Sequence, residues 1–170
     1  MGNGCCFVGH RKIDASFELV TKLTSIIENL IVINGVSEFL FGSKSEFDDL
    51  CYKIVTQLKE KHPYIKRVYV RANYDIIDDD YKKYLLQSFE DTYCPEKVVN
   101  ARRVAYIKRN QDMIDKCSYC IFYYNFQYKP LLKKHSNLFP PKSGTMLAFD
   151  YAVKRGKKIF NIFELINKKK

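Results

Sequence analysis

The sequence has no apolar run that approaches the ~20 residues needed to span a bilayer. It also shows no secretory signal, in which a charged start precedes an apolar core. The Met1-Gly2 start does not favour myristoylation, because Cys6 stands where Ser or Thr is required. We therefore expect a cytoplasmic protein with no membrane partner.

The sequence also lacks the second half of a zinc motif. Cys117 and Cys120 stand at Cys-x-x-Cys spacing, which could indicate zinc or a redox pair. A zinc site needs two further ligands, and the chain has neither a second Cys-x-x-Cys nor a His-x-x-x-His. We expect buried free thiols in a reducing compartment, with no metal and no cofactor.

What the chain does have is enough apolar material for one core. Its 170 residues are 46% hydrophobic and 15% aromatic, without an internal repeat or linker, so we expect a single domain over 1–170. The net charge of +10 is partly local, because lysines cluster at 129–142 and form a tail at 168–170. Basicity suits anionic partners, whether nucleotides, nucleic acid or acidic surfaces, and selects none of them.

Hydrophobic patterning alternates between strands and helices along the whole chain. The alternation predicts an α/β fold with a mostly parallel sheet, covered by helices on both faces, in the strand order 3-2-1-4-5. The expected strands lie at 5–8, 38–41, 67–70, 119–124 and 159–163, and the expected helices at 16–34, 45–62, 99–117 and 143–154. Glycines at 35 and 156 are expected to stop two of these helices.

Two segments depart from this alternation. Residues 72–95 are rich in aromatic and acidic side chains, with a possible short helix at 81–89. This excursion is either a lid over a site or packing that covers a sheet edge. Residues 125–142 are polar and basic and contain three prolines, which indicates a long loop of the kind that is usually functional or mobile.

Three turns carry the candidate ligand-binding residues. Right-handed crossovers bring the carboxyl ends of strands one, two and four together, and open α/β sheets bind ligands at that edge. Two of the turns open helices with small residues, whose N–H groups and dipole can hold a phosphate. None matches a P-loop or Gly-x-Gly-x-x-Gly, so ordinary turns and caps remain an equal interpretation of each. The residues are Gly9, His10 and Arg11, then Gly42, Ser43 and Ser45, and last Ser143, Gly144 and Thr145.

Four motifs in order along the chain support a family resemblance. The motifs are Cys6-Phe7-Val8-Gly9-His10-Arg11, Phe41-Gly42-Ser43-Lys44-Ser45-Glu46-Phe47-Asp48, Arg109-Asn110-Gln111-Asp112-Met113-Ile114-Asp115 and Lys142-Ser143-Gly144-Thr145. Together they resemble the SLOG superfamily, and more narrowly its small bacterial members with a Gly-His-Arg first turn. The resemblance implies a Rossmann-like three-layer sandwich, commonly a homodimer or higher homo-oligomer. It further implies a nucleotide or nucleotide-derived ligand at the strand ends, with Asp48, Arg109 and Asn110 among the binding residues.

Some SLOG relatives are sensors, some bind single-stranded DNA, and the lonely-guy enzymes cleave nucleoside monophosphates at the N-glycosidic bond. Those enzymes use an Arg on the helix before the fourth strand, which Arg109 matches, and then a Gly-Gly-x-Gly-Thr-x-x-Glu turn. Here the glycine pair is Pro141-Lys142, and Ala148 takes the place of the glutamate. Since cleavage calls for a carboxylate near the sugar, we expect binding without catalytic residues.

Three of the candidate binding residues also have a purely structural interpretation. His10 either holds its turn by hydrogen bonding or moves protons. Arg109 either contacts the ligand or forms an ion pair with Asp112 or Asp115 along one helix face. Asp48 either binds the ligand or acts as a helix-start carboxylate.

The first hypothesis for function is a module that senses or sequesters a small nucleotide-derived ligand. The alternative is a nucleoside-monophosphate phosphoribohydrolase or N-glycosidase. A third hypothesis is single-stranded nucleic-acid binding, which the net charge and the Tyr- and Lys-rich stretch 123–134 favour.

Overall fold

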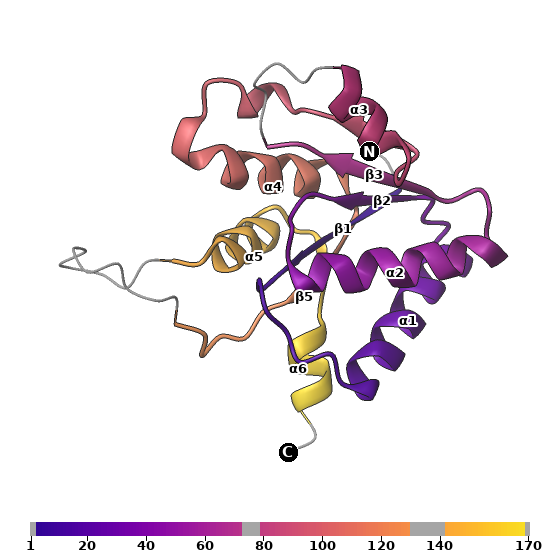
Figure 1. Ribbon diagram of the computed structural model, residues 1–170. Coiled ribbons are helices and arrows are strands. Elements are labelled where there is room, and N and C mark those ends of the chain that lie inside the picture. The colour runs from indigo at the N-terminus through magenta and orange to yellow at the C-terminus, as the bar shows by residue number, and fades with distance from the viewer. Residues whose placement is uncertain (1–2, 73–78, 130–141, 169–170) are drawn as a thin grey trace.

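The computed structural model describes residues 3–72, 79–129 and 142–168. Within these ranges one all-parallel sheet runs in the order β4-β3-β2-β1-β5-β6 (Figure 1). The strands are β1 (Gly4–Gly9), β2 (Glu38–Phe41), β3 (Lys66–Val70), β4 (Asp91–Tyr93), β5 (Tyr119–Tyr123) and β6 (Lys158–Asn161). The helices are α1 (Phe17–Val32), α2 (Glu46–Lys61), α3 (Asp79–Leu86), α4 (Ala105–Lys116), α5 (Gly144–Lys154) and α6 (Ile162–Asn167). The α/β prediction is confirmed.

The sheet separates two apolar layers, and side chains of the central strand β1 alternate between them. Cys5 and Phe7 pack with α1, α2 and α6 on one face, while Cys6 and Val8 pack with α4 and α5 on the other. Figure 1 shows these two groups of helices on opposite sides of the sheet. All four side chains are buried. A strand buried on both faces needs apolar residues at every position, which explains why the first strand reads as a continuous apolar run.

Helix ends follow the local sequence signals. Ser16, Ser45 and Ser143 are N-caps whose hydroxyls accept hydrogen bonds from main-chain N–H groups three residues on. Gly35 and Gly156 follow α1 and α5 with φ of 66° and 63°, in the left-handed region that glycine enters without a Cβ clash. Both predicted glycine stops are confirmed.

Three details of the predicted fold are wrong. The order 3-2-1-4-5 omits β4, a three-residue strand within the 72–95 excursion that pairs with β3 at the sheet edge. The last strand ends at Asn161, and α6 begins at Ile162 because the chain turns back there to pack on the core. α4 starts at Ala105 rather than near residue 99, since Asn100 and Arg102 have positive φ, which interrupts a right-handed helix.

All six cysteines are free thiols, and all but Cys94 are buried, as expected for structural thiols. No helix in the described part of the chain is both long enough and apolar enough to cross a membrane. Most of the predicted basic loop (130–141), the centre of the excursion (73–78) and the end of the lysine tail (169–170) lie outside the described residues.

Candidate functional site

The first turn is built on contact with α2. A Cβ at Gly9 would lie 2.3 Å from Cδ1 of Phe47, so only glycine fits against this buried ring. The main-chain carbonyl of Arg11 accepts a hydrogen bond from the N–H of Glu46 at 3.0 Å. The Glu46 carboxylate in turn accepts one from the N–H of Ile13 at 3.0 Å. The structure thus brings the first and second turns together, with the Arg11 side chain exposed.

His10 ties the first turn to the end of β5. Its Nε2 accepts a hydrogen bond from the N–H of Asn125 at 3.0 Å, and its ring centre lies 4.3 Å from that of Tyr128. Burial lowers the pKa of His10, which keeps the imidazole neutral and Nε2 an acceptor. Of its two interpretations, the geometry favours hydrogen bonding that holds the turn.

The second turn is organised by the carboxylate of Asp48. Its Oδ2 accepts hydrogen bonds from the N–H groups of Gly42 and Ser43, at 3.1 and 2.7 Å. Ser45 Oγ accepts from the Asp48 N–H at 3.1 Å and from the Ser43 hydroxyl at 2.9 Å. The N–H groups of Gly42 and Ser43, expected to be available to a phosphate, are therefore already occupied by an internal anion.

Arg109, on α4, packs against Gly42 of this turn. Arg109 is 4% exposed and donates from Nε and Nη2 to Asn110 Oδ1, at 3.1 and 3.0 Å. Its guanidinium carbon lies 5.5 Å from the centre of the Tyr106 ring. The alternative interpretation, an ion pair of Arg109 with Asp112 or Asp115, is wrong. Those carboxylates pair with Lys97, Lys116 and Arg155 instead.

Asp48 and Arg109 influence one another's ionisation. Burial raises the pKa of Asp48 to about 6, although the hydrogen bonds from Ser43 and Gly42 and the charge of Arg109 act in the opposite direction. Burial likewise lowers the pKa of Arg109, which the Asp48 charge partly offsets. Asp48 Oδ1 is buried and has no hydrogen-bond partner among the described residues. Such a group in an otherwise well-bonded turn requires an explanation.

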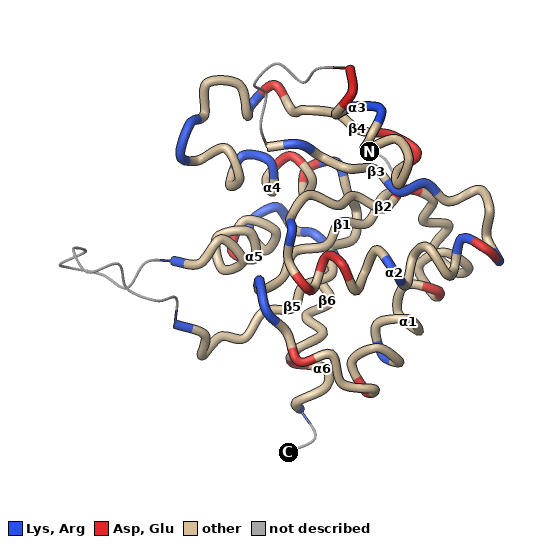
Figure 2. Tube along the Cα trace, in the orientation of Figure 1, with Lys and Arg blue, Asp and Glu red and all other residues tan. Residues whose placement is uncertain are grey.

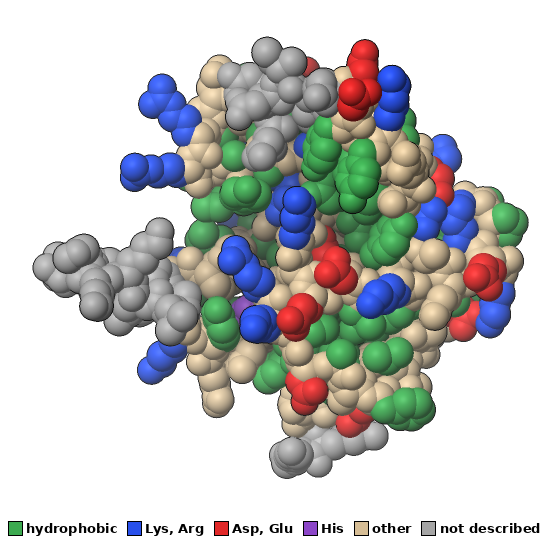
Figure 3. Space-filling model, in the orientation of Figure 1, with side chains coloured by type: hydrophobic (Ala, Val, Ile, Leu, Met, Phe, Trp, Pro, Cys, Tyr) green, Lys and Arg blue, Asp and Glu red, His purple; other side chains and the backbone are tan. Residues whose placement is uncertain are grey.

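A pocket of about 310 Å³ lies beside Asp48, between the second turn, α2 and the segment that includes α3. Among the predicted site residues, Ser43 and Asp48 line it. The lining also includes Phe41, Lys44, Asp49, Tyr52, Tyr69, Tyr81, Tyr84, Leu85, Ser88 and Phe89. Figure 3 shows hydrophobic side chains, which include Tyr, gathered between α3 and α2, with basic side chains beside them.

Most of the aromatic wall of this pocket is not predictable from the sequence, in which the aromatic-rich excursion 72–95 is its one visible signal. The structure confirms that this excursion packs over the sheet, whereas its role as a lid over a site stays a prediction. Tyr81 and Tyr84 on α3 line the pocket, whereas Phe89 packs on Phe41 and Tyr69 at the end of the sheet. The excursion therefore covers the sheet and forms one wall of the pocket.

The third turn opens α5 at the same edge. Ser143 Oγ accepts from the N–H of Met146 at 3.1 Å, Thr145 is buried, and a Cβ at Gly144 would have open space around it. One turn further on, Ala148 is buried in the core. The ring of Phe149 lies 5.2 Å from that of Tyr124, which lies 5.9 Å from that of His10. Aromatic rings thus connect α5 with the first turn.

Charged residues surround this edge. Figure 2 shows basic positions on the segment that follows β1 and on the turn before α2, next to acidic positions at the start of α2. Within the described residues, no group of three or more His, Cys, Asp or Glu side chains is arranged to hold a metal ion. The site therefore offers cationic side chains at its surface and one buried carboxylate inside.

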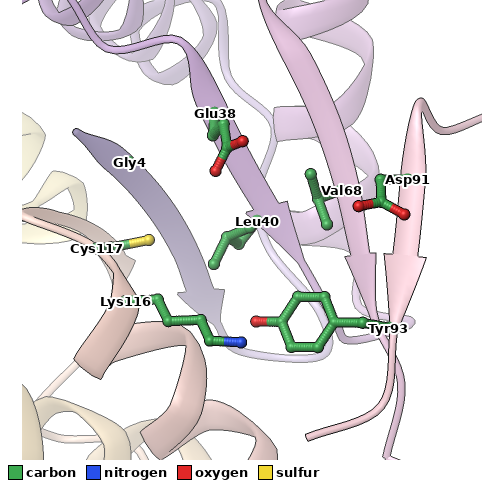
Figure 4. Close-up of a pocket in the computed structure, with 8 residues that line it drawn as sticks. All are labelled: Gly4, Glu38, Leu40, Val68, Asp91, Tyr93, Lys116 and Cys117. Atoms are coloured by element: carbon green, nitrogen blue, oxygen red, sulfur yellow. The ribbon is translucent and has the colours of Figure 1, made fainter. Parts of the chain in front are cut away.

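A smaller pocket, of about 160 Å³, lies on the α4 face of the sheet. Figure 4 shows Lys116 and Tyr93 reaching toward each other across it, and the Lys116 Nζ lies 3.7 Å from the centre of the Tyr93 ring. Glu38 and Asp91, at the amino ends of β2 and β4, also line it. None of the predicted site residues lies there.

Comparison with known proteins does not indicate a function for this chain. No protein-family model matches the sequence, and no curated protein is significantly similar to it.

Proposed function

We propose that this chain binds a small nucleotide or nucleotide-derived ligand in the pocket beside Asp48. The observation that carries the proposal is the composition of this pocket at the carboxyl ends of β2 and β3. Aromatic rings form its wall, and a buried carboxylate with an unsatisfied oxygen lies among them. Apolar clefts with a few convergent polar groups are the usual form of small-molecule sites. Their usual place in open α/β sheets is this edge.

The distribution of charge supports an anionic ligand with a flat ring. Lys44 is exposed and lines the pocket, and Arg11 is exposed on the neighbouring first turn. Flat aromatic bases stack on rings such as Tyr81 and Tyr84. A phosphate would lie toward the basic surface, because the buried Asp48 carboxylate repels it from the interior.

The four motifs that resemble the SLOG superfamily support the same proposal, and with it a role in sensing or sequestering the ligand, in the cytoplasm, as a homodimer or higher oligomer. The position of Ala148 supports binding without cleavage of the N-glycosidic bond. Its methyl group is buried in the core and offers no carboxylate to a sugar.

The direct test is mass spectrometry of any small molecule released when the purified protein is denatured, followed by calorimetry with a panel of nucleoside mono-, di- and triphosphates. Lys44→Ala and Arg11→Ala should each weaken binding about ten- to a hundredfold, the loss expected for a charge-assisted contact, because Lys44 lines the pocket and Arg11 is exposed on the neighbouring turn. Arg155→Ala is the matched control, since Arg155 pairs with Asp115 after the far end of α5. If both site variants bind the nucleotides with unchanged affinity and have unchanged melting curves, the proposal is wrong.

The same protein preparation separates the alternatives. Release of ribose 5-phosphate at an enzyme-dependent rate would favour a phosphoribohydrolase. Binding of single-stranded DNA with a steep loss of affinity as salt rises would favour the nucleic-acid hypothesis.

A further inference from the structure

The pocket beside Asp48 is lined by aromatic rings from several parts of the chain. One group consists of Phe89 with the rings packed around it, those of Phe41, Tyr52 and Tyr69. Tyr81 and Tyr84 on α3 form a second group, with an angle of 19° between the ring planes. Because the face of an aromatic ring is electronegative, a pocket walled by several rings attracts organic cations.

The rings that a ligand can reach include those of Tyr69, Tyr81 and Tyr84. Tyr81 and Tyr84 are 38% and 65% exposed, and Tyr69 is partly exposed near the carboxyl end of β3. Tyr52 is also partly exposed, but the guanidinium carbon of Arg67 already lies 5.2 Å from the centre of its ring. The protein itself thus places a cation against one ring of this wall and leaves the others to a ligand.

Two charged side chains at the same pocket have no partner of opposite charge. Lys44 and Asp49 both line it and are exposed, and neither forms an ion pair within the described part of the chain. Asp49 precedes Tyr52 by three residues on α2, so both side chains lie on one face of the helix. Asp48, in contrast, is 3% exposed, and the buried Arg109 partly offsets its charge. A ligand therefore meets the negative charge of Asp49 and the positive charge of Lys44.

Resting on the proposed function, we propose that this pocket selects nucleotides whose base is a positively charged ring. The cationic ring lies against Tyr69, Tyr81 and Tyr84 with Asp49 beside it, and the phosphate lies at Lys44. A neutral base stacks on the same tyrosines, but it gains no cation–π attraction and leaves the Asp49 charge without a partner. Figure 3 shows acidic and basic side chains next to the hydrophobic ones between α3 and α2, as such a ligand requires.

The test compares nucleotides that differ in the charge of the base, by calorimetry near neutral pH. The first pair is 1-methyl-AMP, whose base is cationic at that pH, and its neutral isomer N6-methyl-AMP. The isomers have the same heavy atoms, so their sizes are matched. The second pair is nicotinamide mononucleotide, with a pyridinium ring, and its reduced, neutral form. Wild-type protein should bind the cationic member of each pair about tenfold more tightly.

Two substitutions locate the cation in this pocket. Asp49→Asn removes the charge at nearly constant size, and Tyr84→Leu removes an exposed ring but keeps an apolar side chain. Each should lower the preference for the cationic member about two- to fivefold, the range for exposed ion pairs and exposed cation–π contacts. Glu60→Gln is the matched control. Glu60 is exposed on the same helix but does not line the pocket, so this variant should keep the wild-type preference.

The outcomes distinguish this inference from the proposed function. If wild-type protein binds both members of each pair equally, or prefers the neutral ones, the inference is wrong while nucleotide binding stands. If Asp49→Asn and Tyr84→Leu both keep the full wild-type preference, the cationic ring lies elsewhere and the inference is again overturned. If none of the nucleotides binds more tightly than about 1 mM, both proposals fail. The comparison in wild-type protein decides the question even if a variant does not fold.

Discussion

Gly42 and Arg109 lie in contact at the turn that follows β2. A Cβ on residue 42 would lie 2.8 Å from both Cδ and Nε of Arg109, and 2.8 Å from Sδ of Met113. The backbone of Gly42 is not in the left-handed region, so the need for glycine here is steric. The missing side chain leaves room for the Arg109 guanidinium to lie buried near Asp48.

Gly42→Ala should displace Arg109 and loosen the second turn. We expect a loss of about 1–3 kcal/mol in the free energy of unfolding, the usual cost of overpacking a well-filled interior. Nucleotide binding should weaken as well. Gly144→Ala is the control, because its Cβ would meet no atom within 4 Å. Urea denaturation of both variants measures the difference, and equal stabilities would contradict the contact.

Gly9→Ala should cost more than Gly42→Ala. The added Cβ would lie 2.3 Å from Cδ1 and 2.5 Å from Cγ of Phe47, a ring that is fully buried against the core. We expect a loss at or above the upper end of the usual range of about 1–3 kcal/mol. Phe47→Leu should recover part of the loss in the double variant. A double-mutant cycle measures that coupling, and strict additivity would show that the two residues do not interact.

Asp48→Asn should change how stability depends on pH. In the unfolded chain Asp48 ionises at its ordinary pKa of 3.8, while in the folded chain the pKa is raised to about 6, chiefly by burial. Between these values the unfolded state loses its proton first, so wild-type stability falls relative to the variant as pH rises. The difference should reach about 3 kcal/mol above pH 6 and vanish below about pH 4.

Urea denaturation of both proteins from pH 4 to pH 8 measures this difference. Arg109, Tyr69 and Cys51 are among the groups that interact electrostatically with Asp48. None of these three titrates in this pH range. Their contributions therefore cancel between wild type and variant. A difference that stays constant with pH would contradict the raised pKa.

His10→Ala should destabilise the protein by about 1–3 kcal/mol near pH 8, because the N–H of Asn125 loses its acceptor in a partly buried site. Burial lowers the pKa of His10 below 6.5, so the unfolded chain takes up a proton first as pH falls. The advantage of wild type over the variant should therefore be full above about pH 7 and shrink as pH falls through 6.5. His10→Gln, whose amide oxygen also accepts, should restore part of the stability without the pH dependence. Thermal melting across pH 5–8 tests this, and a constant difference between His10 and Ala would refute it.

Local signals in the sequence predicted the elements that depend on neighbouring residues. The serine caps at 16, 45 and 143 act within one helical turn, and Gly35 and Gly156 end helices through their own backbone freedom. The alternation of strands and helices depends on hydrophobic period, which is also readable in a short window. These parts of the fold are therefore visible without tertiary structure.

Which groups far apart in the sequence pair with one another depends on the tertiary structure alone. β4 exists because Val68, Tyr69 and Val70 offer an unpaired edge to a segment with little strand signal of its own. Arg109 could reach Asp112, three residues further along its helix, yet it packs against Gly42. Lys97 and Lys116 pair with the Asp112 carboxylate instead. Asp48 sits at a capping position by sequence, but its buried, half-satisfied carboxylate and the aromatic pocket beside it arise from chain segments far apart in sequence. The reason is that burial and the partners of a buried charge depend on the whole packed chain, whereas caps and hydrophobic period depend on a few adjacent residues.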